Sequence, residues 1–173
     1  MMNPKRDSNT PLHARIEMVS GSNIKHIYDA KTGNITVQRA LPKPLPEPYN
    51  YGFLHGTLGE DGDELDVFVI SGKRVSLGDK IAVKPVGVIY MEDENGGDDK
   101  IIATFEGDSA YSDVSRIEEM KPGMIDNLVY YIQHNKDGIP GRFVKIKGIG
   151  DANAAARVIE ESHLRASNSE EDR

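Results

Sequence analysis

The chain has 173 residues, 38% of them hydrophobic, which predicts one domain with a sizeable core rather than a disordered tail. A formal net charge of −7 argues against nucleic acid or an anionic membrane as the main partner, and no apolar run is long enough to span a membrane. The chain has no cysteine for disulfides or zinc–thiolate sites, and its polar N-terminus lacks the apolar core of a signal peptide. We therefore expect a cytoplasmic protein.

The first two-thirds of the chain is strand-like. Apolar and β-branched residues predict short strands over residues 14–19, 24–28, 35–39, 65–70, 80–90 and 100–105. Four prolines between Leu41 and Pro48 exclude a central strand there, because proline cannot donate a ladder hydrogen bond. We expect residues 1–173 to form one domain, with flexible termini over about residues 1–12 and 167–173.

The last third of the chain is helical. Apolar residues recur at helical spacing from residue 124, and this helix ends by Gly138. Residues 143–147 predict a strand, and Asp151 is a good N-cap for a second helix over residues 152–163. Strands followed by helices predict an α+β fold, a small closed antiparallel sheet with helices packed outside.

Four carboxylates lie within six residues in Asp61-Gly62-Asp63-Glu64-Leu65-Asp66, directly before an apolar run. Like charges this close repel each other, so the segment is either an acidic surface turn or a site for a hard divalent cation. The spacing is not that of an EF-hand, because loop positions 5, 6 and 12 carry the wrong residues. A bend at Gly62 or at Glu64-Leu65 would bring Asp61 and Asp66 to one metal, with Asp63 beside it to accept a proton from water.

A second acidic segment covers residues 92–99, with Gly96-Gly97 at its centre. If these glycines form a turn, Asp93 and Asp98 lie near each other across the mouth of a hairpin. One such cluster is more often a solvated loop, but two at the strand ends of a small barrel can converge into a multi-metal site. Mg²⁺ is the favoured ion, because it needs few carboxylates and keeps waters that substrate oxygens can replace.

Isolated cations are found at Lys25, Arg39, Lys100 and Lys136. Each alone is typical of a solvated surface, but Arg39 lies where a strand meets the proline segment, and an arginine fork can bind phosphate with two hydrogen bonds. Tyr51 is either a core aromatic or a hydroxyl donor. The five histidines have no zinc-binding spacing, and the chain has neither a nucleophile elbow nor a Gly-rich phosphate loop.

Taken together, these segments resemble the soluble family I inorganic pyrophosphatases of the short bacterial type, over about residues 14–165. The strongest match is Asp61-Gly62-Asp63-Glu64-Leu65-Asp66-Val67, which is similar to the family signature. Further matches occur in the same order along the chain. They are Asn50-Tyr51-Gly52, Lys84-Pro85-Val86-Gly87-Val88, Met91-Glu92-Asp93-Glu94, Asp98-x-Lys100 and Phe143-Val144-Lys145-Ile146.

The resemblance implies a five-stranded, OB-like β-barrel with flanking α-helices. It implies hydrolysis of inorganic diphosphate to two phosphates with several Mg²⁺ ions per site, Mn²⁺ being the alternative ion, in a homo-oligomer for which a hexamer is favoured. It implies metal ligands at Asp61, Asp66, Asp93, Asp98 and Glu17, and a general base at Asp63. It implies phosphate-binding residues at Lys25, Arg39, Tyr51, Lys100 and Lys136.

The chain departs from the family pattern at the rim of this expected site. Ile27 replaces an active-site glutamate, and Glu47 and Asn135 replace two tyrosines. Two alternatives therefore stay open. The protein could be a phosphohydrolase for a nucleotide or other organic diphosphate, or a non-catalytic module that binds Mg²⁺ and diphosphate.

Overall fold

The computed structural model of the protein describes residues 11–22, 26–28, 32, 34–37 and 45–171. Within these residues the strands are β1 (Leu12–Met18), β2 (His26–Tyr28), β3 (Ile35–Val37), β4 (Asn50–Leu54), β5 (Asp66–Ile70), β6 (Lys80–Asp93), β7 (Gly96–Gly97), β8 (Lys100–Phe105) and β9 (Val144–Gly150). The helices are two short 3₁₀ turns, η1 (Ser109–Tyr111) and η2 (Ile117–Glu119), and the α-helices α1 (Met124–His134) and α2 (Ala152–Glu171).

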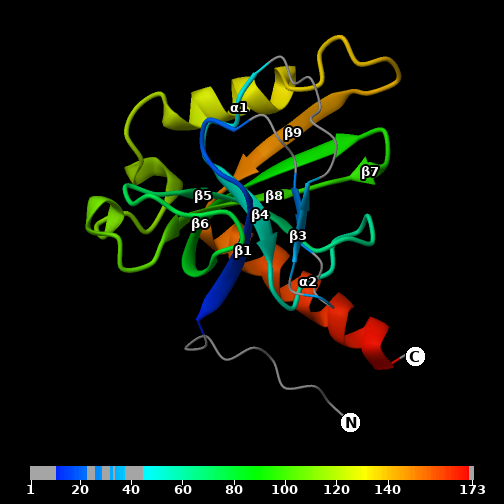
Figure 1. The fold of residues 1–173 in the computed structure, drawn as a ribbon, viewed down its shortest axis with the longest axis horizontal. Helices are drawn as coiled ribbons and strands as arrows, with labels where there is room; N and C mark the ends of the chain where they lie inside the picture. The colour runs from blue at the N-terminus through cyan, green and yellow to red at the C-terminus, as the bar shows by residue number, and fades with distance from the viewer. Residues whose placement is uncertain (1–10, 23–25, 29–31, 33, 38–44, 172–173) are drawn as a thin grey trace.

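Five strands form a closed ring (Figure 1). In the order β1, β4, β5, β8 and β6 each strand pairs with the next, and β6 pairs back with β1. Four pairings are antiparallel and one, between β5 and β8, is parallel. The predicted closed five-stranded sheet with helices outside is confirmed, but the antiparallel prediction is wrong for this pair. A ring with an odd number of strands cannot alternate direction throughout, so one pairing must be parallel.

Alternation along the ring strands divides the core into two clusters. Val67 and Val69 of β5 lie in one cluster with Ile159 of α2, whereas Phe68 lies in the other with Leu128 of α1. The two helices accordingly cover opposite sides of the sheet (Figure 1). Burying each large apolar side chain stabilises the fold by about 1.5–3 kcal/mol, so the two-residue period of the strands determines where each helix docks.

The sequence does not predict β4, because its five residues follow the proline segment and have a glycine at their centre. That glycine is needed where β4 crosses β1. A Cβ atom on Gly52 would lie 1.8 Å from the carbonyl oxygen of Arg15, so no other residue fits without moving the backbone. This close approach places Tyr51, on the next residue, at the wall of the ring.

The acidic hairpin turns two residues earlier than predicted. β6 runs to Asp93, the turn lies at Glu94 and Asn95, and Gly96 pairs with Asp93 as part of β7. The Asp93 carboxylate accepts the Asn95 N–H at 2.8 Å, which stabilises the turn at this position. The prediction that Gly96-Gly97 forms the turn is therefore wrong.

The last helix is longer than predicted. The predicted N-cap is confirmed, because the Asp151 carboxylate accepts the Ala154 N–H at 2.8 Å. The helix runs on to Glu171, so residues 167–171, predicted to be a flexible terminus, are helical. No proline or glycine interrupts this stretch, and Arg165 anchors it by donating to the Leu58 carbonyl at 2.7 Å.

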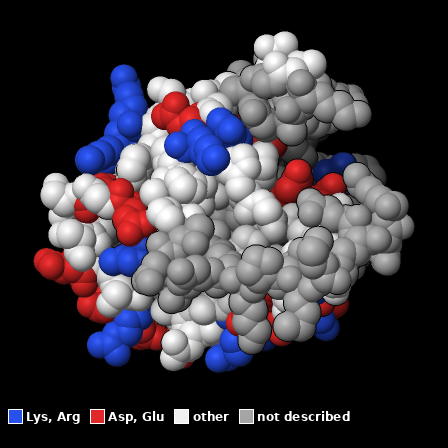
Figure 2. All heavy atoms as spheres, turned by 90° about the horizontal axis from the view of Figure 1, so that it is seen from below, with Lys and Arg blue, Asp and Glu red and all other residues white. Residues whose placement is uncertain are grey.

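The surface drawn in Figure 2 carries charges of both signs. Lysine and arginine side chains lie among aspartate and glutamate side chains instead of forming a continuous basic stripe. Among the helices in the described residues, none is both long and apolar enough to cross a membrane.

Asp108 holds the connection that follows β8. This carboxylate is only 2% exposed and accepts the N–H groups of Gly72 at 2.6 Å and Ala110 at 3.0 Å. Burial opposes its ionisation, but these N–H groups outweigh that effect and lower the pKa of Asp108.

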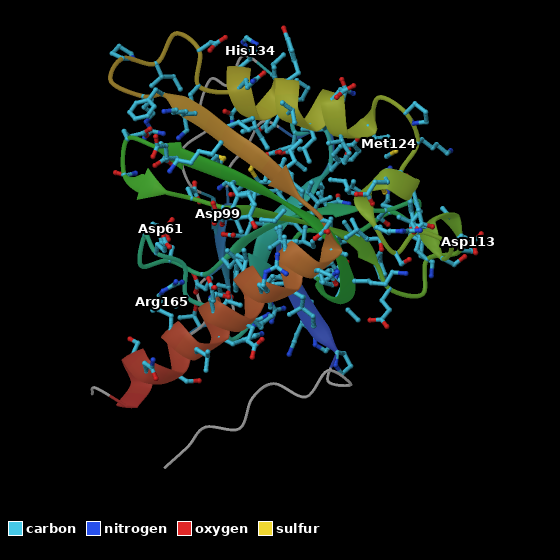
Figure 3. The ribbon with its side chains drawn as sticks, turned by 180° about the vertical axis from the view of Figure 1, so that it is seen from behind. Asp61, Asp99, Asp113, Met124, His134 and Arg165 are labelled. Carbon is cyan, nitrogen blue, oxygen red and sulfur yellow. The ribbon has the colours of Figure 1, made fainter. Side chains whose placement is uncertain are left out.

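Replacing Asp108 by alanine leaves both N–H groups without this acceptor, so the free energy of unfolding should fall by about 2–3 kcal/mol. Because the folded-state pKa lies below the unfolded value, this contribution is complete above about pH 4 and is lost as the pH falls further. Denaturant unfolding at pH 7 and pH 3 measures both effects. Asp113→Ala is the control, since Asp113 is exposed (Figure 3); an equal loss in both variants would contradict the assignment.

Candidate active site

The acidic loop before β5 is shaped by its own backbone. Gly62 has φ of +88°, in the left-handed region that favours glycine, and its N–H donates to the Gly59 carbonyl at 3.1 Å. The Asp63 N–H donates to the Asp61 carboxylate at 3.1 Å, and its carbonyl accepts the Gly59 N–H at 2.6 Å. The bend that Asp61 and Asp66 need in order to converge therefore occurs at Gly62.

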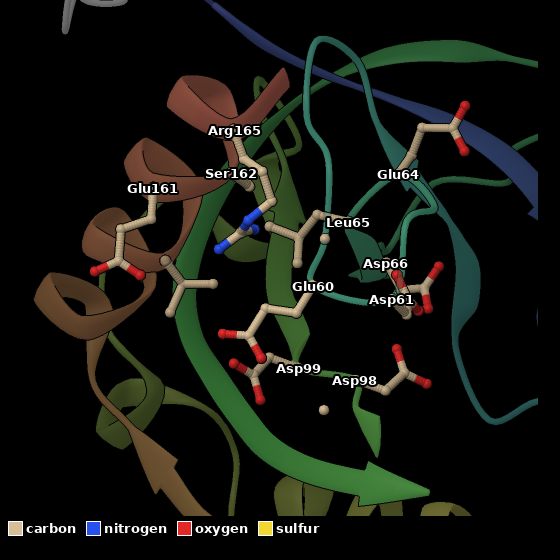
Figure 4. A pocket seen from close by; sticks show the side chains of 13 residues that line it. Glu60, Asp61, Glu64, Leu65, Asp66, Asp98, Asp99, Glu161, Ser162 and Arg165 are labelled. Carbon is tan, nitrogen blue, oxygen red and sulfur yellow. The ribbon is translucent and has the colours of Figure 1, made fainter. Parts of the chain in front are cut away.

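The parallel pair of β5 and β8 brings the two acidic segments to one edge of the ring. Asp66 lies opposite Lys100 in register, so both strands begin at the same edge. Residues 61–66 lead into β5, and the end of the hairpin leads into β8. Figure 4 shows Asp61 and Asp66 beside each other, with Asp98 facing them from the second segment.

Lys100 is the buried centre of this group. Its side-chain ammonium donates to Asp66 at 2.5 Å and to Tyr51 Oη at 2.8 Å, and forms an ion pair with Asp98 at 2.9 Å. Burial alone would lower the pKa of Lys100, but Tyr51, Asp66 and Asp98 raise it well above its usual value. The residue therefore stays charged inside the pocket.

Two carboxyl groups of the cluster are shifted towards the protonated form. Burial raises the pKa of Asp98 to about 6; Lys100 opposes this shift and Asp66 adds to it. Burial also raises the pKa of Asp61, against the hydrogen bond from the Asp63 backbone. These groups hold less negative charge than free carboxylates would, so a further cation near them would be bound favourably.

Asp93 lies on the opposite wall with its own cation. Burial would raise its pKa, but the Asn95 N–H and the Lys136 ammonium, 3.3 Å from its carboxylate, outweigh this and lower the pKa of Asp93. Lys136 also lies 3.4 Å from Glu94, which contacts Arg142 at 3.7 Å. Asp93 is therefore ionised at neutral pH.

One pocket of about 470 Å³ collects these groups. Of the residues predicted for the site, nine line it: Glu17, Tyr51, Asp61, Asp63, Asp66, Asp93, Asp98, Lys100 and Lys136. The predicted phosphate-binding residues Lys25 and Arg39 lie outside the described residues. A smaller pocket, lined by Glu60, Asp99 and Glu161, lies behind Asp61 and Asp98 (Figure 4).

Hard-cation chemistry fits this donor set. Carboxylate oxygens of Asp61, Asp66 and Asp98 share one wall, and Mg²⁺ prefers such ligands. As the side chains stand, no three His, Asp or Glu residues in the described part of the chain are grouped tightly enough to hold a metal ion. The Lys100 ammonium supplies the positive charge between Asp66 and Asp98.

The structure adds residues that the sequence did not assign to the site. Tyr131, Glu94 and Arg142 line the same pocket. Tyr131 has the helical spacing of a core residue and is 4% exposed, so the sequence pattern alone assigns it to packing. Glu47, one of the departures at the expected rim, is also buried in the pocket wall at 3% exposed. The side chain of Ile27 lies outside the described part.

Comparison with known proteins gives one family. The family model for inorganic pyrophosphatase matches residues 14–167. An inorganic pyrophosphatase from Sulfolobus acidocaldarius is 38% identical over 161 residues, covering 92% of this chain and 93% of that protein. One from Brucella suis is 37% identical over 166 residues, covering 95% and 93%.

Solved structures agree with the sequence relatives. The inorganic pyrophosphatase from Helicobacter pylori has a TM-score of 0.85 and 34% identity, covering 90% of this chain and 92% of that chain. The inorganic pyrophosphatase from Thermus thermophilus also has a TM-score of 0.85, with 32% identity, covering 95% and 97%. The similarity in both sequence and fold extends over nearly the whole length.

Replacing Lys100 by methionine removes the shared ammonium and leaves Asp66 and Asp98 facing each other. In the presence of a chelator at pH 7.5, the free energy of unfolding should fall by about 3 kcal/mol. Since the raised pKa of Asp98 favours its neutral form in the folded state, the loss should grow as the pH rises through about 6 and be smaller at pH 4. Adding Mg²⁺ should restore part of it.

Chemical denaturation across this pH range makes the measurement. Lys147→Met is the matched control, because Lys147 is 53% exposed and only pairs with Glu92 at 3.1 Å. A loss in Lys100→Met that did not change with pH would contradict the assigned role of Asp98.

Proposed function

The chain belongs to the inorganic pyrophosphatase family, and on that premise we propose how its pocket hydrolyses inorganic diphosphate to two phosphates. One observation carries the assignment of this pocket. The parallel β5–β8 pair brings two acidic segments and the cations Lys100 and Lys136 to one cavity. That combination suits a substrate that is strongly anionic and is handled as a complex with divalent cations.

Several Mg²⁺ ions, with Mn²⁺ as the alternative, would be held by the carboxylates. Asp61, Asp66 and Asp98 would form one site, Asp93 with Asp98 another, and Glu17 would contribute on the substrate side. Bound Mg²⁺ would supply Lewis-acid charge that neutralises the diphosphate and lowers the pKa of water. Asp98, neutral in part at pH 6 without metal, then serves as a fully ionised ligand.

Asp63 is the proposed general base. Its backbone is bonded on both sides, to Asp61 and to Gly59, while its carboxylate is exposed at the pocket. A fixed backbone with an accessible carboxylate lets Asp63 accept the proton of the attacking water without rearranging the loop. Lys100, Lys136 and Tyr51 would orient the phosphates and offset their charge, and Lys25 and Arg39 are assigned to the same task from the sequence.

Asp63→Asn should lower kcat for diphosphate by about 100-fold or more, because an amide cannot accept the proton. The fold should persist, since the side chain is exposed. Phosphate release from diphosphate in the presence of Mg²⁺ is the measurement. Glu64→Gln is the matched control, an adjacent exposed carboxylate for which a change within about twofold is expected.

Equal phosphate release by wild type and Asp63→Asn would contradict the assignment of the base. The same assay with a panel of nucleotides and other organic diphosphates tests substrate choice. Diphosphate should be preferred, and a nucleotide as the better substrate would favour the organic diphosphatase alternative. Binding of diphosphate without turnover would favour a non-catalytic module.

We further propose a cytoplasmic homo-oligomer, with a hexamer favoured. Large apolar side chains that a monomer would leave in water support an assembly: Tyr130, Phe143, Ile149 and Leu164. Light scattering after size exclusion should give the mass of six chains of 19.1 kDa, and a monomer at micromolar concentration would contradict this.

A further inference from the structure

A polar chain of three side chains crosses the wall of the pocket, and it contains two of the residues that set this sequence apart. The Tyr131 hydroxyl forms side-chain hydrogen bonds with Glu47 and with Asn135. Glu47 is 3% exposed and Tyr131 is 4% exposed, and all three residues line the pocket that holds the carboxylates and Lys100.

The chemistry of the groups sets the direction of this chain. An ionised carboxylate has no hydrogen to donate, so the Tyr131 hydroxyl donates to Glu47. The hydroxyl oxygen is then the acceptor for the Asn135 amide nitrogen, whose other end, Oδ1, is buried without a hydrogen-bond partner among the described residues. Burial raises the pKa of Tyr131 and the Glu47 carboxylate raises it further, while Asn135 opposes the shift, so the hydroxyl keeps its proton.

The chain connects segments that are far apart in sequence. Glu47 is held through its backbone, since its N–H donates to the Ser22 carbonyl at 2.9 Å and its carbonyl accepts the Gly21 N–H at 2.7 Å. The Tyr131 ring is held by Phe68, edge to face at 6.4 Å between centroids. Both ends of the hydroxyl's environment are therefore rigid.

The other end of the chain reaches a substrate-facing cation. Asn135 ends α1, its backbone N–H donating to the Tyr131 carbonyl at 2.8 Å, and Lys136 is the next residue. The Lys136 ammonium reaches Asp93 and Glu94 across the pocket. A change in the orientation of Asn135 would therefore move the backbone that carries Lys136.

We propose that Tyr131 is a positioning residue for diphosphate: through Glu47 and Asn135 it fixes the end of α1 so that Lys136 meets the substrate phosphate. This inference rests on the proposed function of the pocket. It assigns the network to substrate affinity, because none of its members lies beside Asp63 at the attacking water. It also gives Glu47 a reason to be buried near an anionic substrate, since its charge is used as the acceptor for Tyr131.

The central test is Tyr131→Phe, which removes the hydroxyl and keeps the ring that packs on Phe68. KM for diphosphate should rise about tenfold, the usual effect of losing a hydrogen bond to a charged group, while kcat changes by less than about twofold. Glu47→Gln keeps an acceptor oxygen and should retain KM far better than Glu47→Leu. Tyr131→Phe combined with Glu47→Leu should raise KM no more than either alone, because both break one network.

Tyr49→Phe is the matched control. Tyr49 follows Glu47 by two residues, and its hydroxyl donates to the Met124 carbonyl at 3.2 Å, at the start of the same helix. It joins the same two segments, but Tyr49 does not line the pocket. A network with only a structural role predicts similar losses of thermal stability in both variants and no change of KM in either.

The outcomes are distinct. A rise of KM confined to Tyr131→Phe supports the proposal. An unchanged KM in folded Tyr131→Phe overturns it, and so does an equal rise in Tyr49→Phe. Should Tyr131→Phe fail to fold, Asn135→Ala, at the end of the helix, makes the same test.

A binding measurement separates this inference from the proposed function. Calorimetry with diphosphate and Mg²⁺ compares Asp63→Asn with Asp63→Asn combined with Tyr131→Phe, so turnover does not interfere. A dissociation constant about tenfold higher in the combined variant supports the positioning role, and an unchanged one overturns it. If the wild type releases no phosphate, the proposed function fails, yet this comparison still decides the role of Tyr131.

Discussion

A buried lysine shared between carboxylates is the interaction on which the site depends. Lys100 contacts Asp66, Asp98 and Tyr51 at once, from three different parts of the chain. Without a cation, carboxylates at this spacing repel each other and burial adds to the cost, as the raised pKa of Asp98 shows. The ammonium offsets that repulsion while the pocket remains rich in oxygen ligands for Mg²⁺.

The geometry of the ring explains why these groups meet. Five strands in a closed sheet require one parallel pair, and here that pair is β5 with β8. Parallel strands begin at the same edge, so the acidic segment before each strand is delivered to one place. In an antiparallel pair the two segments would lie at opposite edges, and Asp61 and Asp98 could not share a wall.

The wall opposite the carboxylates shows how a family pocket can be altered without being lost. The predicted metal ligands and the predicted base all line one cavity. The departures Glu47 and Asn135 are not isolated changes, because Tyr131 connects them. A buried carboxylate that would otherwise weaken binding of an anion is satisfied by a hydroxyl, and the polar atoms become part of a connected network.

Much of the fold follows from local patterns in the sequence. The strands with alternating or β-branched residues, the helix spacing after residue 124 and the Asp151 N-cap are local signals, and the structure agrees with them. β4, the end of α2 and the position of the hairpin turn were beyond such signals. They depend on a close backbone crossing at Gly52, on the Arg165 contact with Leu58 and on the Asp93 side chain.

The sequence by itself determined the chemistry of the site, because residue types and their spacing specify carboxylates, cations and a flexible glycine at position 62. Tertiary structure alone decided which groups share a charge, since Lys100 meets Asp66 and Tyr51 only through strand pairing. It also decided that Glu47, Tyr131 and Asn135 form one unit. Contacts between residues far apart in the chain arise from ring closure and helix docking, and no local pattern encodes them.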